Sequence, residues 1–195
     1  YLELAPQFIT HPLRMLLSEP TFPFRFENML HDMFSYGERV MADRIQNPRE
    51  DLLTTIANAK LGDKPMSQSY LDGSWLLIIF AGNDTTRNSL SGTIRLLTEF
   101  PDQRQMVIDD PSLIERMSHE ALRMVSPVMH MRRTALEDAE VAGQRIAKDE
   151  KVVMWYGAAN RDPTVFPNPD VFDMTRPNVD KHLAFGHGVH RCLGN

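Results

Sequence analysis

The feature that most limits how this chain can fold is a long stretch without proline. The stretch covers residues 67–100, between Pro65 and Pro101, and its most apolar part is residues 75–81. Proline removes a backbone donor and clashes with the preceding turn, so an uninterrupted helix must lie between prolines. The stretch therefore predicts one long helix. Its apolar part is too short to cross a bilayer, which needs about 20 apolar residues.

Shorter elements are expected on both sides of this helix. The spacing of apolar residues and the positions of proline and glycine predict further helices over residues 26–45, 51–59, 102–108 and 113–125. Ser112 and Glu115 have the spacing of a capping box, so we expect them at the start of the last of these helices. The pattern after Met131 predicts short strands at residues 139–142, 145–147 and 151–156, with a turn at Gly143-Gln144. The fold class is therefore mainly α with a small β region.

Two segments are rich in proline and are not expected to contain long helices. Residues 1–25 are expected to form an apolar loop, with a helical piece at residues 13–17, or else a poorly ordered end. Residues 163–177, which we call the meander, are expected to form an irregular loop that leads toward the only cysteine, Cys192.

Charge and cysteine content exclude several classes of protein. The net charge is −5, and lysine and arginine do not gather in runs. The sequence therefore lacks the clustered basic residues that are typical of nucleic-acid binding. A single cysteine excludes an intrachain disulfide and a cysteine-rich zinc site, and it fits a reducing compartment.

A polar run interrupts the long helix directly after its most apolar turn. The run is Ala81-Gly82-Asn83-Asp84-Thr85-Thr86. Gly, Asn, Asp and Thr are poor residues for a helix interior, and short polar side chains compete for backbone hydrogen bonds. We therefore expect a locally opened helix, with a groove for a small molecule and polar groups that deliver protons. The alternative is a polar patch on an exposed helix face.

The cysteine lies on a glycine-rich segment, residues 185–195, which we call the cysteine loop. Its sequence is Phe-Gly-His-Gly-Val-His-Arg-Cys-Leu-Gly-Asn. Glycine lets a backbone run close to a flat ligand and adopt positive φ. A lone cysteine on such a loop suits a single thiolate ligand that reaches a metal from one side, although an ordinary cysteine on a turn is the alternative. His182 and His187 are expected to face solvent.

The first ten residues of the cysteine loop resemble the haem-binding signature of the cytochromes P450, the haem-thiolate monooxygenases. The resemblance implies the cytochrome P450 fold, of which this chain would be a fragment from the C-terminal half. It also implies haem b as the cofactor and Cys192 as the axial ligand of the haem iron, a thiolate that favours O–O cleavage. Phe185 and Gly186 would lie against the haem on the side of the sulfur.

The same resemblance assigns roles to residues elsewhere in the chain. The polar run is similar to the oxygen-binding signature of the family: Gly82 would leave room for dioxygen, and Asp84 and Thr85 would deliver protons to it. Arg133 and His190 would bind the two haem propionates, since arginine can hold a carboxylate through two hydrogen bonds. Arg132 is the next candidate for a propionate.

Glu120 and Arg123 lie three residues apart on a predicted helix. Alone, such a pair is usually a surface ion pair worth about 0.2–0.5 kcal/mol. The resemblance instead implies a buried pair that supports the cysteine loop. Many family members add an arginine after a Pro-x pair in the meander, but here Val171 follows Pro169-Asp170. Arg161 and Arg176 are both candidates for the third partner of the Glu120–Arg123 pair.

The resemblance as a whole predicts one partial domain over residues 1–195, truncated at both ends. It implies a cytoplasmic bacterial monooxygenase that inserts one oxygen atom from dioxygen into an apolar C–H bond of an alkane, fatty, terpenoid or steroid-like substrate. Electrons would come from a ferredoxin and its reductase, or from a flavin reductase, with NAD(P)H. The 195 residues alone are expected to be inactive. The alternatives are a haem-binding sensor or carrier and a peroxide-driven peroxygenase.

Overall fold

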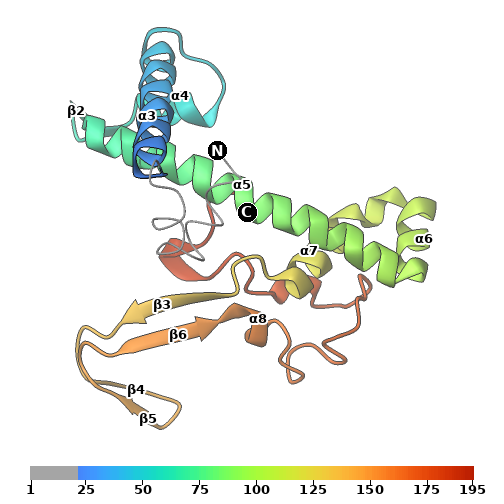
Figure 1. Cartoon of the computed structure of the whole chain (residues 1–195). Helices are drawn as coiled ribbons and strands as arrows, with labels where there is room; N and C mark the ends of the chain where they lie inside the picture. Colours follow the sequence, from blue (N-terminus) through green and yellow to red (C-terminus); the bar gives the residue numbers. More distant parts are fainter. Residues whose placement is uncertain (1–21) are drawn as a thin grey trace. The chain divides into compact units, whose positions relative to one another are not determined.

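The structure is a computed structural model that describes the backbone from Phe22 and the side chains from Glu27 to the last residue, Asn195. The expectations for residues 1–21, including the helical piece at 13–17, lie outside the described residues. The described chain is mainly helical with little β structure, as expected, and its strands form three two-stranded sheets (Figure 1). The strands Lys60–Leu61, Lys64–Pro65 and His130–Thr134 were not predicted. The chain divides into two compact units, residues 1–81 and 82–195, which we describe one at a time.

The first unit is built around a small apolar core. It contains α3 (Phe22–Gln46), α4 (Leu52–Ala57), the short strands β1 (Lys60–Leu61) and β2 (Lys64–Pro65), and the beginning of α5 (Gln68–Glu99). Met41, Ala57 and Trp75 are its buried centre. The helix α3 begins four residues earlier than predicted, because its first turn tolerates Pro23.

Trp75 and Gly37 touch where α3 meets α5. The Trp75 indole nitrogen donates a hydrogen bond to the Met33 carbonyl at 3.1 Å. A Cβ atom at Gly37 would lie only 2.6 Å from the indole carbons, whereas a Cβ at Gly73, on α5, would meet nothing within 4 Å. Glycine at position 37 is therefore a packing requirement, and glycine at position 73 is not.

This difference predicts opposite effects of the same substitution. Gly37→Ala is expected to displace the indole and destabilise the protein by about 1–3 kcal/mol, the usual cost of overpacking. Gly73→Ala, the matched control, is expected to stabilise it by about 0.8–1 kcal/mol through helix propensity. Urea unfolding followed by tryptophan fluorescence measures both. Equal midpoints for the two variants would contradict the packing argument.

The second unit places helices beside an extended β region. After α5 come α6 (Pro101–Asp109), the turn η1 (Pro111–Leu113) and α7 (Ile114–Val125). Leu96 from α5 and Ala121 and Met124 from α7 form its apolar core together with Phe172 and Met174 of the meander. The core therefore ties the meander to the two helices.

The start of α7 differs from the prediction. Its first residue follows Leu113, which makes no side-chain cap, and Ser112 lies within η1. Asp110 accepts a hydrogen bond from the Ser112 backbone at 3.0 Å and so caps η1 instead. The capping box is wrong because a proline, Pro111, starts a 3₁₀ turn before the α-helix begins. The end at Val125, before Pro127, is as predicted.

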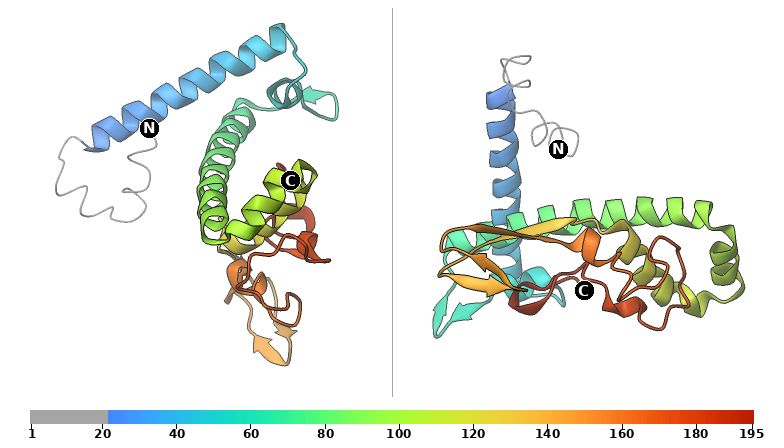
Figure 2. Two further views of the ribbon diagram at one scale, coloured as in Figure 1. Left: turned by 90° about the vertical axis from the view of Figure 1, so that its right-hand side faces the viewer. Right: turned by 90° about the horizontal axis from the view of Figure 1, so that it is seen from below.

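Four strands and three short helical turns complete the second unit. The elements are β3 (His130–Thr134), β4 (Ala139–Val141), β5 (Gln144–Ile146), β6 (Lys151–Trp155), α8 (Tyr156–Ala159), η2 (Val179–Lys181) and η3 (Gly188–His190). β3 pairs antiparallel with β6, from His130 opposite Trp155 to Thr134 opposite Lys151. β4 and β5 form a hairpin at the end of that pair, seen from three sides in Figures 1 and 2.

The hairpin turn lies one residue earlier than predicted. Ala142 and Gly143 both have positive φ, 50° and 79°. Two positive φ values are typical of a type I′ turn, in which glycine favours the second central position. Gln144 is therefore the first residue of β5 and not part of the turn.

Candidate functional site

The cysteine loop folds back on itself next to Cys192. Gly186 and Gly188 have φ of 71° and 78°, in the region that favours glycine. The Cys192 backbone N–H donates to the Phe185 carbonyl at 2.9 Å, and that of Arg191 donates to the Gly188 carbonyl at 3.0 Å. The first residue of the loop therefore holds the backbone of the cysteine.

The Cys192 side chain is a free, exposed thiol. The apolar side chains of Val189 and Leu193, on either side of it, are 97% and 79% exposed. Among the described residues, no group of three or more His, Cys, Asp or Glu side chains could hold a bare metal ion. A single thiol flanked by exposed apolar side chains fits a flat, apolar group that brings its own metal, and haem is such a group.

The two expected propionate partners, an arginine and a histidine, are exposed and lie on different elements. Arg133 lies on β3, and its guanidinium donates to the Arg132 carbonyl at 3.0 Å. His190 is the last residue of η3. In the described part of the chain, neither has a carboxylate partner, so both are available to a carboxylate ligand. Because successive strand residues point to opposite faces, Arg132 and Arg133 lie on opposite faces of β3.

The expected opening of the long helix is wrong. The helix α5 runs unbroken from Gln68 to Glu99 and passes through the whole polar run (Figure 2). The hydroxyl groups of Ser89, Ser91 and Thr93 each donate to the carbonyl four residues earlier, at 2.7–2.9 Å. Such bonds satisfy the polar side chains without breaking the helix.

The proton-delivery candidates lie on this intact helix. Asp84 is exposed and accepts hydrogen bonds from Arg87 at 3.4 Å and Asn88 at 3.2 Å, both on the same helix. Thr85 is half-buried. A Cβ atom at Gly82 would meet nothing within 4 Å, so there is open space beside that residue.

Glu120 and Arg123 form a fully buried ion pair on α7. Both side chains are 0% exposed. The guanidinium donates to both carboxylate oxygens at 2.8 Å. Arg176 is the third partner: its Nε donates to Glu120 at 2.9 Å. We call these three residues the buried cluster. Arg161, the other candidate, instead pairs with the exposed Asp170.

The buried cluster holds the meander through backbone carbonyls. Arg123 donates to the carbonyls of Asn160 at 2.8 Å and Pro169 at 2.7 Å. Arg176 donates to those of Asn168 at 2.6 Å, Val171 at 2.8 Å and Pro167. Among the described residues, no buried side-chain nitrogen or oxygen lacks a hydrogen-bond partner. One carboxylate and a set of carbonyl dipoles therefore balance two buried cations.

Asn160 connects the buried cluster to the chain that enters the cysteine loop. The residue is 0% exposed. Its amide donates to the Ser126 hydroxyl at 2.9 Å and accepts from the Leu183 backbone N–H at 2.6 Å, while its carbonyl accepts from Arg123. Sequence reasoning missed this residue, because nothing local distinguishes a buried asparagine from one on a turn.

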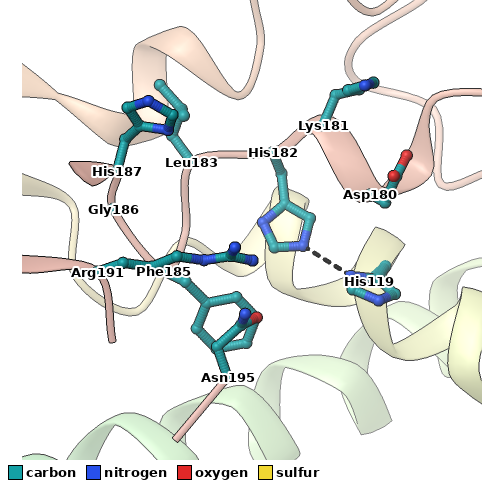
Figure 3. A pocket seen from close by; sticks show the side chains of 10 residues that line it. All are labelled: His119, Asp180, Lys181, His182, Leu183, Phe185, Gly186, His187, Arg191 and Asn195. Carbon is teal, nitrogen blue, oxygen red and sulfur yellow. Dashed lines mark hydrogen bonds between the residues drawn. The ribbon is translucent and has the colours of Figure 1, made fainter. Parts of the chain in front are cut away.

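His182 is also buried, at 7% exposed, contrary to the expectation that it faces solvent. It lines a cavity of about 340 Å³ together with His119, Phe185 and Arg191 (Figure 3). His187, which lines the same cavity, is exposed as expected.

No helix among the described residues is both long and apolar enough to cross a membrane.

Known proteins are similar to this chain over most of its length. The chain is 41% identical to linalool 8-monooxygenase of Pseudomonas putida over 173 residues, which cover 89% of this chain and 42% of that protein. It is 35% identical to the methyl-branched lipid omega-hydroxylase of Mycobacterium bovis over 171 residues, 87% of this chain and 40% of that protein. The solved structure of cytochrome P450-153 from Novosphingobium aromaticivorans matches with a TM-score of 0.78 and 43% identity, covering 92% of this chain and 44% of that one.

The chain thus spans less than half of the length of each of these relatives. The family model for cytochrome P450 matches residues 24–195. That match includes the buried cluster, the polar run of α5 and the cysteine loop. The chain therefore belongs to the cytochrome P450 family.

Proposed function

We propose that this chain provides the cysteine-loop part of a haem monooxygenase that inserts one oxygen atom from dioxygen into an apolar C–H bond. The observation that carries the proposal is the exposed Cys192 thiol between two exposed apolar side chains, on a loop that is anchored to a buried ion cluster. The Cys192 backbone is held by the Phe185 carbonyl, and a ligand to a single iron needs a backbone held in this way.

The residues around the thiol fit haem b. Cys192 would ligate the iron, Phe185 and Gly186 would lie beside the sulfur, and Arg133 and His190 would bind the two propionates. Iron with a thiolate ligand supplies the cleavage of the O–O bond. The protein would supply the sulfur ligand, hydrogen-bond donors for the carboxylates and a source of protons.

Asp84 and Thr85 are the proposed source of protons. The Asp84 side chain is exposed to water, and Thr85, which is half-buried, would pass a proton inward through its hydroxyl. The open space at Gly82, three residues earlier on the same helix, would admit dioxygen. Residues three and four apart lie on one face of a helix, so Gly82 and Thr85 share a face.

The proposal also includes a class of substrate, an electron donor and a cellular location. Two relatives are named for reactions on linalool and on methyl-branched lipids. We therefore propose an apolar substrate of the alkane, fatty, terpenoid or steroid-like class. Electrons would come from NAD(P)H through a ferredoxin and its reductase or through a flavin reductase, and the protein would act in the cytoplasm.

The proton pathway is tested by three variants of the whole haem-loaded enzyme of which this chain is proposed to be a part. Asp84→Asn is expected to lower turnover by about 10²-fold or more, since general acid catalysis contributes 10²–10⁴-fold. Thr85→Ala is expected to keep its haem but divert electrons into hydrogen peroxide. Thr86→Ala, the exposed neighbour, is the matched control and should stay coupled. The measurement is product and peroxide formed per NAD(P)H consumed.

Two results would contradict this function. If Thr85→Ala couples electrons to product as well as the wild type does, Thr85 has no role in proton delivery. If the wild type forms product only from added hydrogen peroxide and never with NAD(P)H and a redox partner, the protein is a peroxygenase.

A further inference from the structure

His119 and His182 form an imidazole pair that links α7 to the segment before the cysteine loop. His119 Nδ1 and His182 Nε2 lie 3.1 Å apart, and the ring centroids are separated by 5.3 Å. Figure 3 shows the two rings meeting at the side of the cavity, joined by the dashed line. The two residues are 63 positions apart in the sequence, so this contact is purely tertiary.

The hydrogen bonds around His182 assign one tautomer to each ring. The Ala184 backbone N–H donates to His182 Nδ1 at 3.2 Å. That nitrogen therefore accepts, and in a neutral imidazole the other nitrogen carries the hydrogen. His182 Nε2–H then donates to His119 Nδ1, which leaves the His119 hydrogen on Nε2. The pair is complete without any positive charge.

The surroundings of His182 keep its ring neutral. Burial, followed by the repulsion that a protonated His119 would exert, lowers the pKa of His182 to about 4. The charged groups that face it are Glu120 and Arg123 on α7 and Asp180 on η2. A proton on Nδ1 would also break the bond from Ala184, because two N–H groups would then point at each other.

The same tautomers argue against a metal ion between the two rings. A metal on His182 Nε2 would require the hydrogen to move to Nδ1, which already accepts from Ala184. The histidine pair therefore holds two segments of the chain together and is not suited to bind a metal ion.

From His182 the contacts lead directly to the cysteine. The His182 ring packs against the Phe185 ring, with centroids 5.6 Å apart. The Phe185 carbonyl accepts the Cys192 N–H at 2.9 Å. These two contacts connect the His182 ring to the backbone of Cys192 through one residue, Phe185.

We propose that His182, held by His119 and by the Ala184 backbone, is a positioning residue that fixes the Cys192 backbone through Phe185. The purpose of this positioning rests on the proposed function, in which Cys192 is a haem ligand. The contacts all lie between residues of this chain, so they are tested by a readout other than enzymatic activity.

The first test measures hydrogen exchange of backbone amides in the full chain. His182→Gln removes the Nδ1 acceptor and is expected to speed exchange at both Ala184 and Cys192 by about tenfold, the effect of losing one hydrogen bond. His182→Asn keeps an acceptor near the Nδ1 position, so Ala184 should stay protected. His119→Ala removes only the partner of Nε2, and we expect faster exchange at Cys192. His187→Asn is the control, because it changes an exposed histidine of the same cavity.

If His182 and His119 only stabilised the fold in general, the pattern of amide exchange rates would be different. Positioning predicts faster exchange at Cys192 with unchanged exchange in the middle of α7. If all amides of residues 82–195 accelerate together, or if Cys192 is unaffected in the folded His182→Gln and His119→Ala variants, the proposal is overturned. An unprotected Cys192 amide in the wild type would overturn it as well.

The pH dependence gives a second readout. Because the pKa of His182 lies below its ordinary value of 6.5, the opened loop takes up a proton before the closed loop does. Protection of Cys192, corrected for intrinsic exchange, should therefore be constant above about pH 6.5 and fall between pH 6.5 and 4. His182→Asn cannot take up this proton and should show a shallower fall. An identical pH profile in the two proteins would contradict the role of His182.

The spectrum of the haem-loaded protein separates this inference from the proposed function. If amide exchange at Cys192 behaves as expected but the haem-loaded wild type lacks thiolate ligation, only the proposed function fails. If ligation is present but exchange at Cys192 is unchanged in the variants, only the positioning role fails.

Discussion

Replacing Arg123 by methionine is expected to unfold the second unit or leave it barely stable. Arg123 is 0% exposed and donates to both oxygens of Glu120, which is equally buried. Removing one partner of a buried ion pair costs about 3–5 kcal/mol, because the other charge stays in the interior. Here the backbone carbonyls of Asn160, Pro169 and Val171 lose a donor as well. A domain has only about 5–15 kcal/mol of stability to lose.

The matched control is the same substitution at the surface. Arg145 is 79% exposed and pairs with Asp138, which is 59% exposed. Exposed pairs contribute about 0–1 kcal/mol, so Arg145→Met should unfold almost like the wild type. Arg123→Lys keeps the charge but not the planar fork, and we expect it to lie between the two. Urea unfolding followed by circular dichroism measures all three, and equal midpoints for Arg123→Met and Arg145→Met would contradict the account.

Helices were the most predictable part of the fold. The bounds of α5 differ from the prediction by one residue at each end, because Pro65 and Pro101 limit where that helix can lie. The start of α7 was not predictable from local chemistry, since Ser112 and Glu115 fit a capping box but Pro111 directs the chain into a 3₁₀ turn. The unbroken course of α5 through Asp84 and Thr85 was missed because polar side chains are satisfied within the helix: Asp84 accepts from Arg87 and Asn88, and the Ser89 hydroxyl donates to the Thr85 carbonyl.

The candidate site, like the fold, contains residues that could be predicted from the sequence and residues that could not. Cys192, Glu120 and Arg123 belong to motifs that the sequence displays directly. The choice between Arg161 and Arg176 depends on the path of the meander, which has no periodic pattern to predict it. Asn160 and His182 were missed because their burial results from contacts with Ser126 and His119, which are distant in the sequence.

Replacing Cys192 by histidine is expected to abolish thiolate ligation completely. The chain contains no other cysteine, so no second thiol can take its place. A histidine side chain presents a neutral nitrogen instead of a charged sulfur, and it lacks the electron donation that favours O–O cleavage. The buried cluster does not touch the Cys192 side chain, so the variant should remain folded. Monooxygenase activity should disappear even if haem still binds.

The most direct test of the central claim is the absorption spectrum of the ferrous carbon-monoxide complex of the haem-loaded protein. The account predicts the red-shifted Soret band of thiolate ligation in the wild type. The same band should be absent from Cys192→His at equal haem content. A wild type without this band, or a Cys192→His variant that retains it, would contradict the assignment of Cys192 as the ligand of the haem iron.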